Sequence, residues 1–346
     1  MTTNDRRRLP AEWEPQGAVM IAWPHEGTDW AYMLPEVRRC YTALAHAIAS
    51  RALLIVIGPE LDSAREALAG IDTERVRFVR VETNDTWTRD YGAITTIGAD
   101  GAPGLHDFCF NGWGLKFAAC HDNMATRELV RGGTLHGCYD NRLGFVLEGG
   151  SIDSDGRGTL LTTSACLMSP NRNGDLSRAE IEDELHRTLG AERVLWLDYG
   201  ALAGDDTDSH VDTLVRLAPH DTIIYTGCQD PTDEHFEQLQ AMKRQLEALR
   251  TADGRPYNLV ELPLPDAVYD EGGERLPATY ANFLPLNGAV LMPVYGQERK
   301  DRLACDTMRV AFDGYEIVPV DCSALIRQHG SLHCATMQFP PQAIAL

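Results

Sequence analysis

Hydrophobic residues occur along this chain in short runs, separated by longer amphipathic stretches. Residues 51–57 are apolar after Arg51 and end at Gly58-Pro59, the pattern of a buried strand, whereas residues 76–81 alternate as in a half-buried strand. The same criteria predict further strands at residues 92–98, 144–148, 158–163, 193–197, 213–218, 222–226, 259–263, 288–293 and 316–320.

Helical periodicity separates many of these strands. Residues 35–50 carry Pro35 at a position suited to the first helical residue, and residues 177–189 begin with the S-x-x-E capping box of Ser177. The longest helical pattern covers residues 231–250. Further helices are predicted at residues 60–69, 122–131 and 300–313, the last with Gly314 as its C′ residue.

The predicted elements give a mixed α/β chain with two or three strands for each helix. Strict alternation of strand and helix is missing, and the glycine pairs fit no dinucleotide- or phosphate-binding loop, so a Rossmann sheet is disfavoured. A strand–strand–helix–strand unit recurring every ~60–70 residues is typical of a pseudo-symmetric propeller. No low-complexity linker divides the sequence, and we therefore expect one domain over residues 1–346.

Charge narrows the classes of partner. The formal net charge is −20, which argues against nucleic acid or an anionic membrane surface and favours small cationic molecules. The N-terminal segment has no apolar run after its arginines, and no stretch is long enough to cross a membrane, so we expect a cytoplasmic protein.

The cysteines do not suggest disulfides or zinc. Their number is odd and no C-x-x-C pair occurs, so most of them are expected to be small buried side chains in a reducing compartment. They are Cys40, Cys109, Cys120, Cys138, Cys166, Cys228, Cys305, Cys322 and Cys334.

The candidate chemistry centres on His210-Val211-Asp212 and on Cys334. In an extended segment alternate residues point the same way, so we expect His210 and Asp212 to share one face. A cysteine can attack a cationic carbon, a histidine can move protons, and a carboxylate can hold a positive substrate. Small residues around Cys334 leave room for close approach.

Two further acidic segments join this set. Glu148 ends an apolar run before Gly149-Gly150, where a buried carboxylate needs a partner and could orient a histidine. Asp90 follows Trp87, and a carboxylate beside an aromatic ring suits a guanidinium or an amine. Each segment also has a purely structural interpretation. Glu148 could accept hydrogen bonds in a turn, and Asp90 could form an internal ion pair with Arg89.

These residues alone are also compatible with other classes of function. His210 with Asp208 and Asp212 could bind a divalent metal in a hydrolase, although no second histidine motif supports it. The acidic loop before His210 could also be an ordinary solvated loop, and a propeller could bind cations without catalysis. Survival of activity in a chelator, and its loss on alkylation of Cys334, would favour cysteine chemistry.

Taken in order, the motifs resemble those of the agmatine deiminase family, which is related to bacterial-type peptidylarginine deiminases. The resemblance spans nearly the whole chain. The similar segments are Leu9–Pro15 with Ala22-Trp23-Pro24, Trp87–Gly92, Phe110–Phe117, Glu148-Gly149-Gly150, His210-Val211-Asp212, Tyr280–Phe283 and His333-Cys334.

The resemblance implies a pentein fold, a five-fold pseudo-symmetric α/β propeller with a central active site. It implies Cys334 as nucleophile, His210 as general acid/base with Glu148 as its partner, and Asp90 and Asp212 as guanidinium ligands. Trp87 would wall the substrate channel. No metal or other cofactor is expected, and a homodimer or larger homo-oligomer is implied.

The expected reaction is hydrolysis of agmatine to N-carbamoylputrescine and ammonia through a covalent thiouronium, a step toward putrescine. The alternative is another guanidine, such as free or peptide-linked arginine, whose carboxylate or amide would need a partner such as Arg89 or Lys116. Several positions beside the site depart from the family pattern, and they leave the far end of the substrate open. These positions are Ala93, Ser209, residues 328–331 and residues 337–339.

Overall fold

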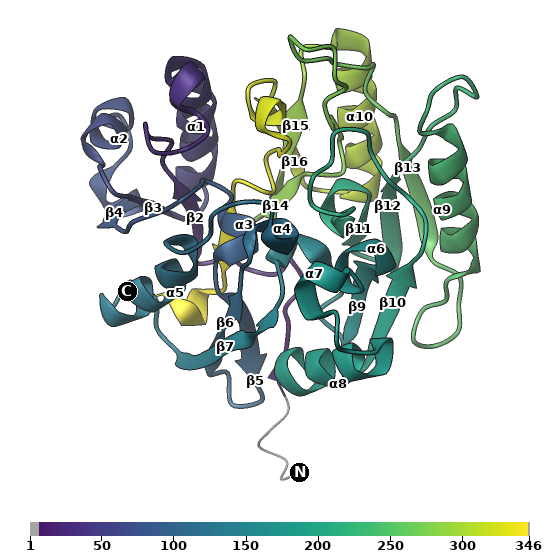
Figure 1. Ribbon diagram of the computed structural model, residues 1–346, viewed down its shortest axis with the longest axis horizontal. Coiled ribbons are helices and arrows are strands. Elements are labelled where there is room, and N and C mark those ends of the chain that lie inside the picture. The colour runs from purple at the N-terminus through teal and green to yellow at the C-terminus, as the bar shows by residue number, and fades with distance from the viewer. Residues whose placement is uncertain (1–6, 345–346) are drawn as a thin grey trace.

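The computed structural model describes residues 7–344, and within this range the strands form five small sheets (Figure 1). Each sheet contains the same unit: two antiparallel strands, then a strand parallel to the second of them. A helix connects the parallel strands, as such a crossover requires. Figure 1 shows the sheets around a common centre, with these helices at the periphery.

Three units follow one another along the chain. They are β8 (Ile152–Ser154), β9 (Thr159–Thr163), α8 (Arg178–Leu189) and β10 (Arg193–Leu197); β11 (Val215–Ala218), β12 (Thr222–Thr226), α9 (Phe236–Ala248) and β13 (Asn258–Leu262); and β14 (Leu284–Leu286), β15 (Ala289–Val294), α10 (Glu298–Ala311) and β16 (Glu316–Asp321). Before them lies the unit of β5 (Ile94–Gly98), β6 (Pro103–Cys109), α5 (Ala125–Arg131) and β7 (Cys138–Val146), with β1 (Arg7–Arg8) beside β5.

The fifth unit combines the two ends of the described chain. The C-terminal strand β17 (Met337–Phe339) pairs antiparallel with β2 (Ala18–Ala22), with Met337 opposite Met20. Helix α1 (Leu34–Ala49) leads to β3 (Leu53–Gly58), and α2 (Asp62–Ala67) leads to the edge strand β4 (Val76–Arg80). This pairing closes the ring and confirms the predicted five-fold α/β propeller.

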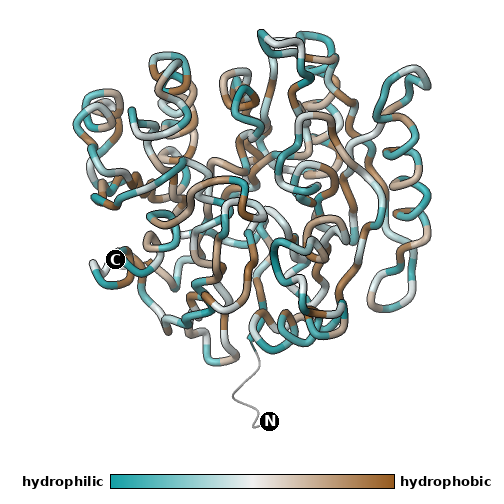
Figure 2. The backbone as a smooth tube through the Cα atoms, viewed as in Figure 1, coloured by the Kyte–Doolittle hydropathy of each residue, from teal (hydrophilic) through white to brown (hydrophobic). Residues whose placement is uncertain are grey.

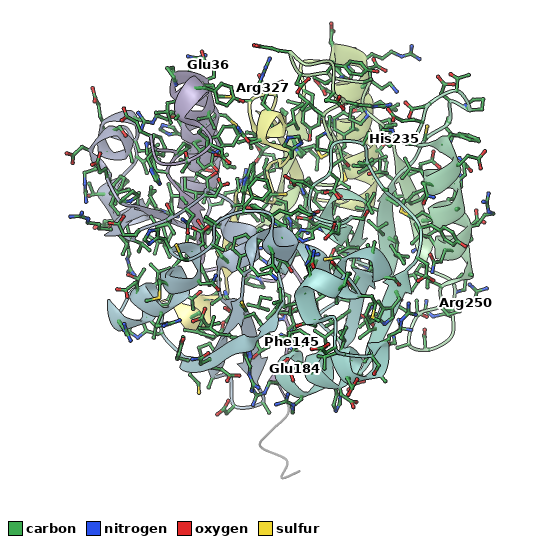
Figure 3. The ribbon with its side chains drawn as sticks, viewed as in Figure 1. Glu36, Phe145, Glu184, His235, Arg250 and Arg327 are labelled. Carbon is green, nitrogen blue, oxygen red and sulfur yellow. The ribbon has the colours of Figure 1, made fainter. Side chains whose placement is uncertain are left out.

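The hydrophobic pattern explains this arrangement. Central strands such as β2 and β15 are buried along nearly their whole length, whereas the helices bury one face; α1, for example, buries Val37, Tyr41, Leu44 and Ile48. Figure 2 accordingly shows brown strands inside and mostly teal helix surfaces outside. In Figure 3, Phe145 lies within the fold, while Glu36 and Arg250 lie toward its edges.

Helix boundaries agree with the sequence in part. The capping box of α8 is present, with Ser177 accepting from Glu180 N and Glu180 accepting from Ser177 N. Pro35 is the second residue of α1 rather than the first, and Gly314 lies beyond the C-cap Phe312 of α10. Helix α9 begins at Phe236 instead of residue 231, because the preceding residues form turns held by aspartate side chains.

Six strands were not predicted from the pattern. Strand β1 has two residues, and strands β8, β14 and β17 have three each, too few to show a period. Strand β2 is short and buried throughout, and β6 buries the polar residues His106 and Asp107, which bond Thr96 and Tyr139. Among the described residues no helix is long and apolar enough to cross a membrane; residues 1–6 of the N-terminal segment lie outside the described range.

Candidate active site

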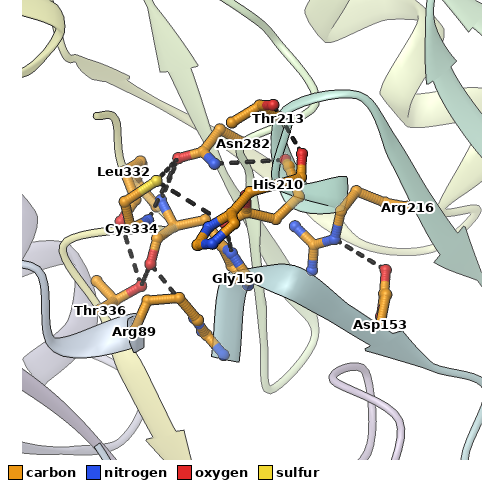
Figure 4. A network of polar contacts seen from close by, with 12 residues as sticks. Arg89, Gly150, Asp153, His210, Thr213, Arg216, Asn282, Leu332, Cys334 and Thr336 are labelled. Carbon is orange, nitrogen blue, oxygen red and sulfur yellow. Dashed lines mark hydrogen bonds and ion pairs between the residues drawn. The ribbon is translucent and has the colours of Figure 1, made fainter. Parts of the chain in front are cut away.

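The predicted site residues meet at the centre of the ring, on connections rather than on regular strands. Asp90 is in the short helix α3 (Thr88–Tyr91), Asp212 is in the 3-10 helix η5 (Val211–Thr213), and Cys334 is in the turn before β17. All of the polar candidates are buried: Asp90, Glu148, His210, Asp212 and Cys334. Figure 4 shows how Cys334, Asn282, His210 and Gly150 face one another.

Gly150 marks the point where three of these side chains converge. A Cβ atom at this position would lie 2.8 Å from His210 Nδ1, 2.9 Å from Asp90 Oδ1 and 3.0 Å from Asp212 Oδ2. The Gly150 N–H donates to Asp90 Oδ1 at 2.9 Å. The glycine therefore lets the backbone approach three functional groups at once, which no larger residue could do.

The expected extended conformation of His210-Val211-Asp212 is wrong. His210 precedes the 3-10 turn of residues 211–213, and the strand begins only at Val215. The preceding Asp208 and Ser209 both have φ of 63°, so the chain turns sharply into the site. Ser209 therefore occupies a backbone conformation that glycine adopts most readily.

The thiol of Cys334 faces a carboxylate and an amide. Its Sγ lies 3.8 Å from Asp212 Oδ2 and 3.4 Å from Asn282 Oδ1. Asn282 Oδ1 also accepts from the backbone N–H groups of His333 and Cys334, at 2.9 and 3.3 Å, and so fixes the turn that carries the sulfur. Burial, with the charges of Asp212 and Asp90, raises the pKa of the Cys334 thiol well above its usual value.

His210 is a neutral imidazole in this environment. Burial lowers its pKa to about 3, a shift that nearby Asp212 only partly opposes. Its Nδ1 lies 3.7 Å from Asp90 Oδ1, and its Nε2 is buried without a hydrogen-bond partner among the described residues. A neutral ring with an unsatisfied nitrogen can take up a proton during a reaction.

Glu148 is held by an arginine instead of by His210. Its Oε1 accepts from Arg172 Nε at 2.8 Å, and Arg172 also donates to Asp208 Oδ2 at 2.6 Å. A carboxylate oxygen of Glu148 and a ring nitrogen of His210 lie within 4.8 Å of each other, but no hydrogen bond joins these two residues. Burial raises the pKa of Glu148, although Arg172 opposes that shift.

The two aspartates have opposite pKa shifts. Burial raises the pKa of Asp90 well above its usual value, with Asp212 adding to the effect. Burial would also raise the pKa of Asp212, but its bond with His333 brings that pKa below the usual value. Asp212 Oδ1 is buried and has no hydrogen-bond partner in the described chain, so it can accept from a ligand.

Trp113 supports Asp90 from a strained segment. Its indole Nε1–H donates to Asp90 Oδ2 at 2.8 Å, and its φ of 54° places it in the left-handed region. The Asn111–Gly114 segment of the sequence resembled the family, but nothing in its local pattern identified the carboxylate that the indole would bind. Asn282, Arg172 and His333 were missed as contacts of the site for the same reason.

A small cavity leads from Cys334 toward the surface between aromatic and acidic side chains. Asp90 and Trp87 line it on the inside, with Trp87 packed against Gly330. Around the rest of the cavity lie Asp29, Asp85, Trp113, Phe117, Asp206, Thr207, Thr213, Gln328 and His329. Within the described residues, neither lysine nor arginine lines this cavity.

Two of the acidic groups in this cavity titrate near neutrality. Burial raises the pKa of Asp85 to about 7 and the pKa of Asp206 to about 6. A negative charge on either group is therefore costly until a cation approaches.

The basic residues considered for an arginine substrate are already engaged. Arg89 binds Glu12 and Gln338, and Lys116 binds the Asp206 carbonyl and Asp208. Since Asp208 pairs with both Lys116 and Arg172, it is occupied by cations and not directed at a metal with His210. In the described part of the chain, the ligand-type groups that gather around His210 are instead Glu148 and Cys166.

Comparison with known proteins places this site in a family. The model of the Porphyromonas-type peptidyl-arginine deiminases matches residues 8–340. The chain belongs to this family. Its members include the agmatine deiminases, as the sequence motifs indicated, and the protein is a hydrolase of the deiminase type that acts on C–N bonds of guanidine groups.

Individual relatives cover almost the entire chain. A provisionally named agmatine deiminase of Vibrio parahaemolyticus is 33% identical over 96% of this chain and 96% of its own length. A cysteine-to-serine variant of the C. jejuni agmatine deiminase, solved with substrate bound, is 35% identical, with a TM-score of 0.90 over 98% of this chain and 97% of that one. A provisionally named arginine deiminase of Porphyromonas gingivalis is 50% identical, with a TM-score of 0.93 over 98% and 100%.

Proposed function

We propose that this protein hydrolyses agmatine to N-carbamoylputrescine and ammonia, a step toward putrescine. The reaction would proceed through a covalent thiouronium on Cys334, in one catalytic domain spanning residues 1–346. The observation that carries the choice of agmatine is the acidic cavity beside Cys334, in which Asp85 and Asp206 flank the way to Asp90.

In this proposal the guanidinium binds between Asp90 and Asp212. A guanidinium presents planar N–H groups that match carboxylate oxygens, and Asp212 Oδ1 is an open acceptor. Holding the group between two carboxylates orients its central carbon toward the sulfur. The same positive charge favours ionisation of Asp90 and of the Cys334 thiol, whose pKa values are otherwise raised.

Attack begins when the Cys334 thiol transfers its proton to neutral His210 and the sulfur bonds to the central carbon. His210 then protonates one amino group of the tetrahedral adduct, and ammonia leaves as the thiouronium forms. In the second half, His210 takes a proton from water as the oxygen attacks. As that adduct collapses, the C–S bond breaks, His210 returns its proton to the departing sulfur, and the hydroxyl proton of the adduct passes to solvent. These steps release the ureido product and restore the thiol.

The roles of Glu148 and Trp87 are electrostatic and steric. A carboxylate near His210 would stabilise the imidazolium that forms in each half-reaction, while Arg172 keeps that carboxylate in place. Trp87 would form one wall of the channel for the substrate's methylene chain.

Agmatine fits the acidic cavity because it carries an ammonium group at its far end. An arginine substrate would place its α-carboxylate or peptide amide there, among aspartates and with Arg89 and Lys116 already paired. The C. jejuni relative supports agmatine, while the name of the Porphyromonas relative keeps arginine as the second candidate.

The test is ureido-product formation from agmatine, free arginine and a blocked arginyl peptide, offered in parallel to the purified protein. We expect the largest kcat/KM for agmatine. A larger value for either arginine substrate would move the assignment to that substrate while retaining the reaction.

A further inference from the structure

His333, the residue immediately before Cys334, lies between two carboxylates. Its side chain is 1% exposed, and its Nδ1 is 2.7 Å from Asp212 Oδ2. On the other side its Nε2 is 2.8 and 3.0 Å from the two carboxylate oxygens of Glu12. Both ring nitrogens therefore face oxygen atoms that accept hydrogen bonds when ionised.

The number of protons on the ring follows from this geometry. A neutral imidazole has one N–H donor, and an ionised carboxylate has none, so both contacts are hydrogen bonds only if the ring carries two protons. The neighbours of both carboxylates favour their ionised form. Burial opposes ionisation of Glu12, but Arg216, His333 and Arg89 bring its pKa well below the usual value, and the pKa of Asp212 is also lowered.

The surrounding charges balance when His333 is an imidazolium. Arg216 bonds Asp153 at 2.9 Å and also binds Glu12, while Arg89 Nη1 lies 3.2 Å from Glu12 Oε1. Three buried acids thus meet three buried cations, and a buried ion cluster that is neutral and fully paired avoids the cost of an isolated charge. The acids are Glu12, Asp153 and Asp212, and the cations are Arg89, Arg216 and His333.

We infer that His333 is a positioning residue for the deiminase reaction: as an imidazolium, it keeps Asp212 ionised and turns its Oδ1 toward the substrate guanidinium. The inference rests on the proposed function. Because Oδ2 is occupied by His333, only Oδ1 remains for the ligand, and it is buried without a partner among the described residues. The contacts of His333 also reach the nucleophile, since the backbone N–H groups of His333 and Cys334 both donate to Asn282 Oδ1.

The first measurement is the charge state of His333 in the intact protein, without turnover. In a histidine ¹⁵N NMR spectrum at neutral pH, assigned by comparison with His333→Asn, we expect both ring nitrogens of His333 to have imidazolium shifts. A neutral tautomer would overturn the inference whatever the activity.

The second measurement separates positioning from structural support. We expect His333→Phe to raise KM for agmatine about 10- to 100-fold, the effect of losing a hydrogen bond to a charged group. His333→Asn should recover part of this loss, because its amide can still donate to Asp212. In an Asp212→Asn background, His333→Phe should change KM by less than about threefold, since the residue through which it acts is already altered.

The pH profile gives an independent readout. Without the imidazolium the pKa of Asp212 rises, so the acid limb of kcat/KM should move to higher pH. The charged groups that face this pair are Glu12 from the N-terminal segment, Arg89 from α3, Arg216 from β11, Asp90, His210 and Cys334.

A matched control is His106→Phe, which removes another buried histidine that bonds a carboxylate, Asp140, in a different sheet. We expect its KM and acid limb to match those of the wild type. If His333→Phe lowered only the folded fraction and left KM and the acid limb of kcat/KM unchanged, as expected for the control, the positioning role would be wrong. Failure of the wild type to use any guanidine would overturn the proposed function. The NMR spectrum would still report the charge state of His333 between Glu12 and Asp212.

Discussion

The indole N–H of Trp113 donates to Asp90 Oδ2 at 2.8 Å. Because the Gly150 N–H donates to Asp90 Oδ1, both oxygens of this carboxylate are held in place. The bond favours the ionised form of Asp90, against burial and the charge of Asp212, both of which raise its pKa. A tryptophan that lines the cavity thus also sets the orientation and charge of a proposed guanidinium ligand.

Replacing Trp113 by phenylalanine should therefore impair substrate binding. We expect kcat/KM for agmatine to fall about 10- to 100-fold, mainly through KM, because a hydrogen bond to a charged group is lost. Trp196→Phe is the control, since its indole bonds Glu182 and neither residue lines the cavity beside Cys334. If Trp113→Phe and the wild type had the same kcat/KM and KM for agmatine, the hydrogen bond from Trp113 to Asp90 would have no part in substrate binding.

Arg172 should be a determinant of stability. Arg172→Met leaves Glu148 buried without its partner, and we expect the free energy of unfolding to fall by about 3–5 kcal/mol. Urea denaturation measures this change. Adding Glu148→Gln should recover part of the loss, because the uncompensated charge is then removed; no recovery would mean that the ion pair is not the cause.

The ionisation of Cys334 should depend on the ligand. Burial and two aspartates raise the pKa of its thiol in the free protein, so little thiolate is present at neutral pH. A bound guanidinium opposes these charges and should lower that pKa. Titration by thiolate absorbance, with the Cys334→Ser signal subtracted, tests the effect; identical titrations with and without a cationic ligand would contradict it.

Asp85 and Asp206 should select agmatine over a guanidine without an amine. We expect Asp206→Asn and Asp85→Asn to lower kcat/KM for agmatine but not for butylguanidine. Since their pKa values are raised to about 6 for Asp206 and about 7 for Asp85, both are protonated at lower pH. The preference for agmatine should therefore increase as the pH rises through this range.

The exposed Asp313 is the control for these two variants, because it carries the same charge outside the cavity. Asp313→Asn should leave both substrates unaffected. If it lowered agmatine turnover as much as Asp206→Asn does, the effect would come from net charge and not from a binding contact.

The sequence predicted candidate residues of the site but few of the contacts between them. Cys334, His210, Asp90, Asp212 and Glu148 each stand in a short motif, and residues from distant segments do meet at the centre. Their partners depend on which connections face one another across the ring, which no local pattern records. For this reason the pairing of Glu148 with Arg172 could not be predicted.

The fold shows the same division. Amphipathic helices and long apolar strands were predictable from their periods, but strands of three residues were not. The alternate spacing of His210 and Asp212 suggested an extended segment. It could not reveal the turn, because Asp208 and Ser209 adopt the left-handed conformation that is rare outside glycine. Sequence reasoning also missed β6, since a strand that buries His106 and Asp107 lacks the usual alternation.

The most direct test of the central claim is N-carbamoylputrescine formation from agmatine by the wild type and by Cys334→Ser, each measured in a metal chelator. The account predicts turnover by the chelated wild type, and a loss on the order of 10⁴-fold or more in the variant, as for removal of a nucleophile. Comparable turnover by Cys334→Ser, or loss of wild-type activity in the chelator, would contradict cysteine-based deimination.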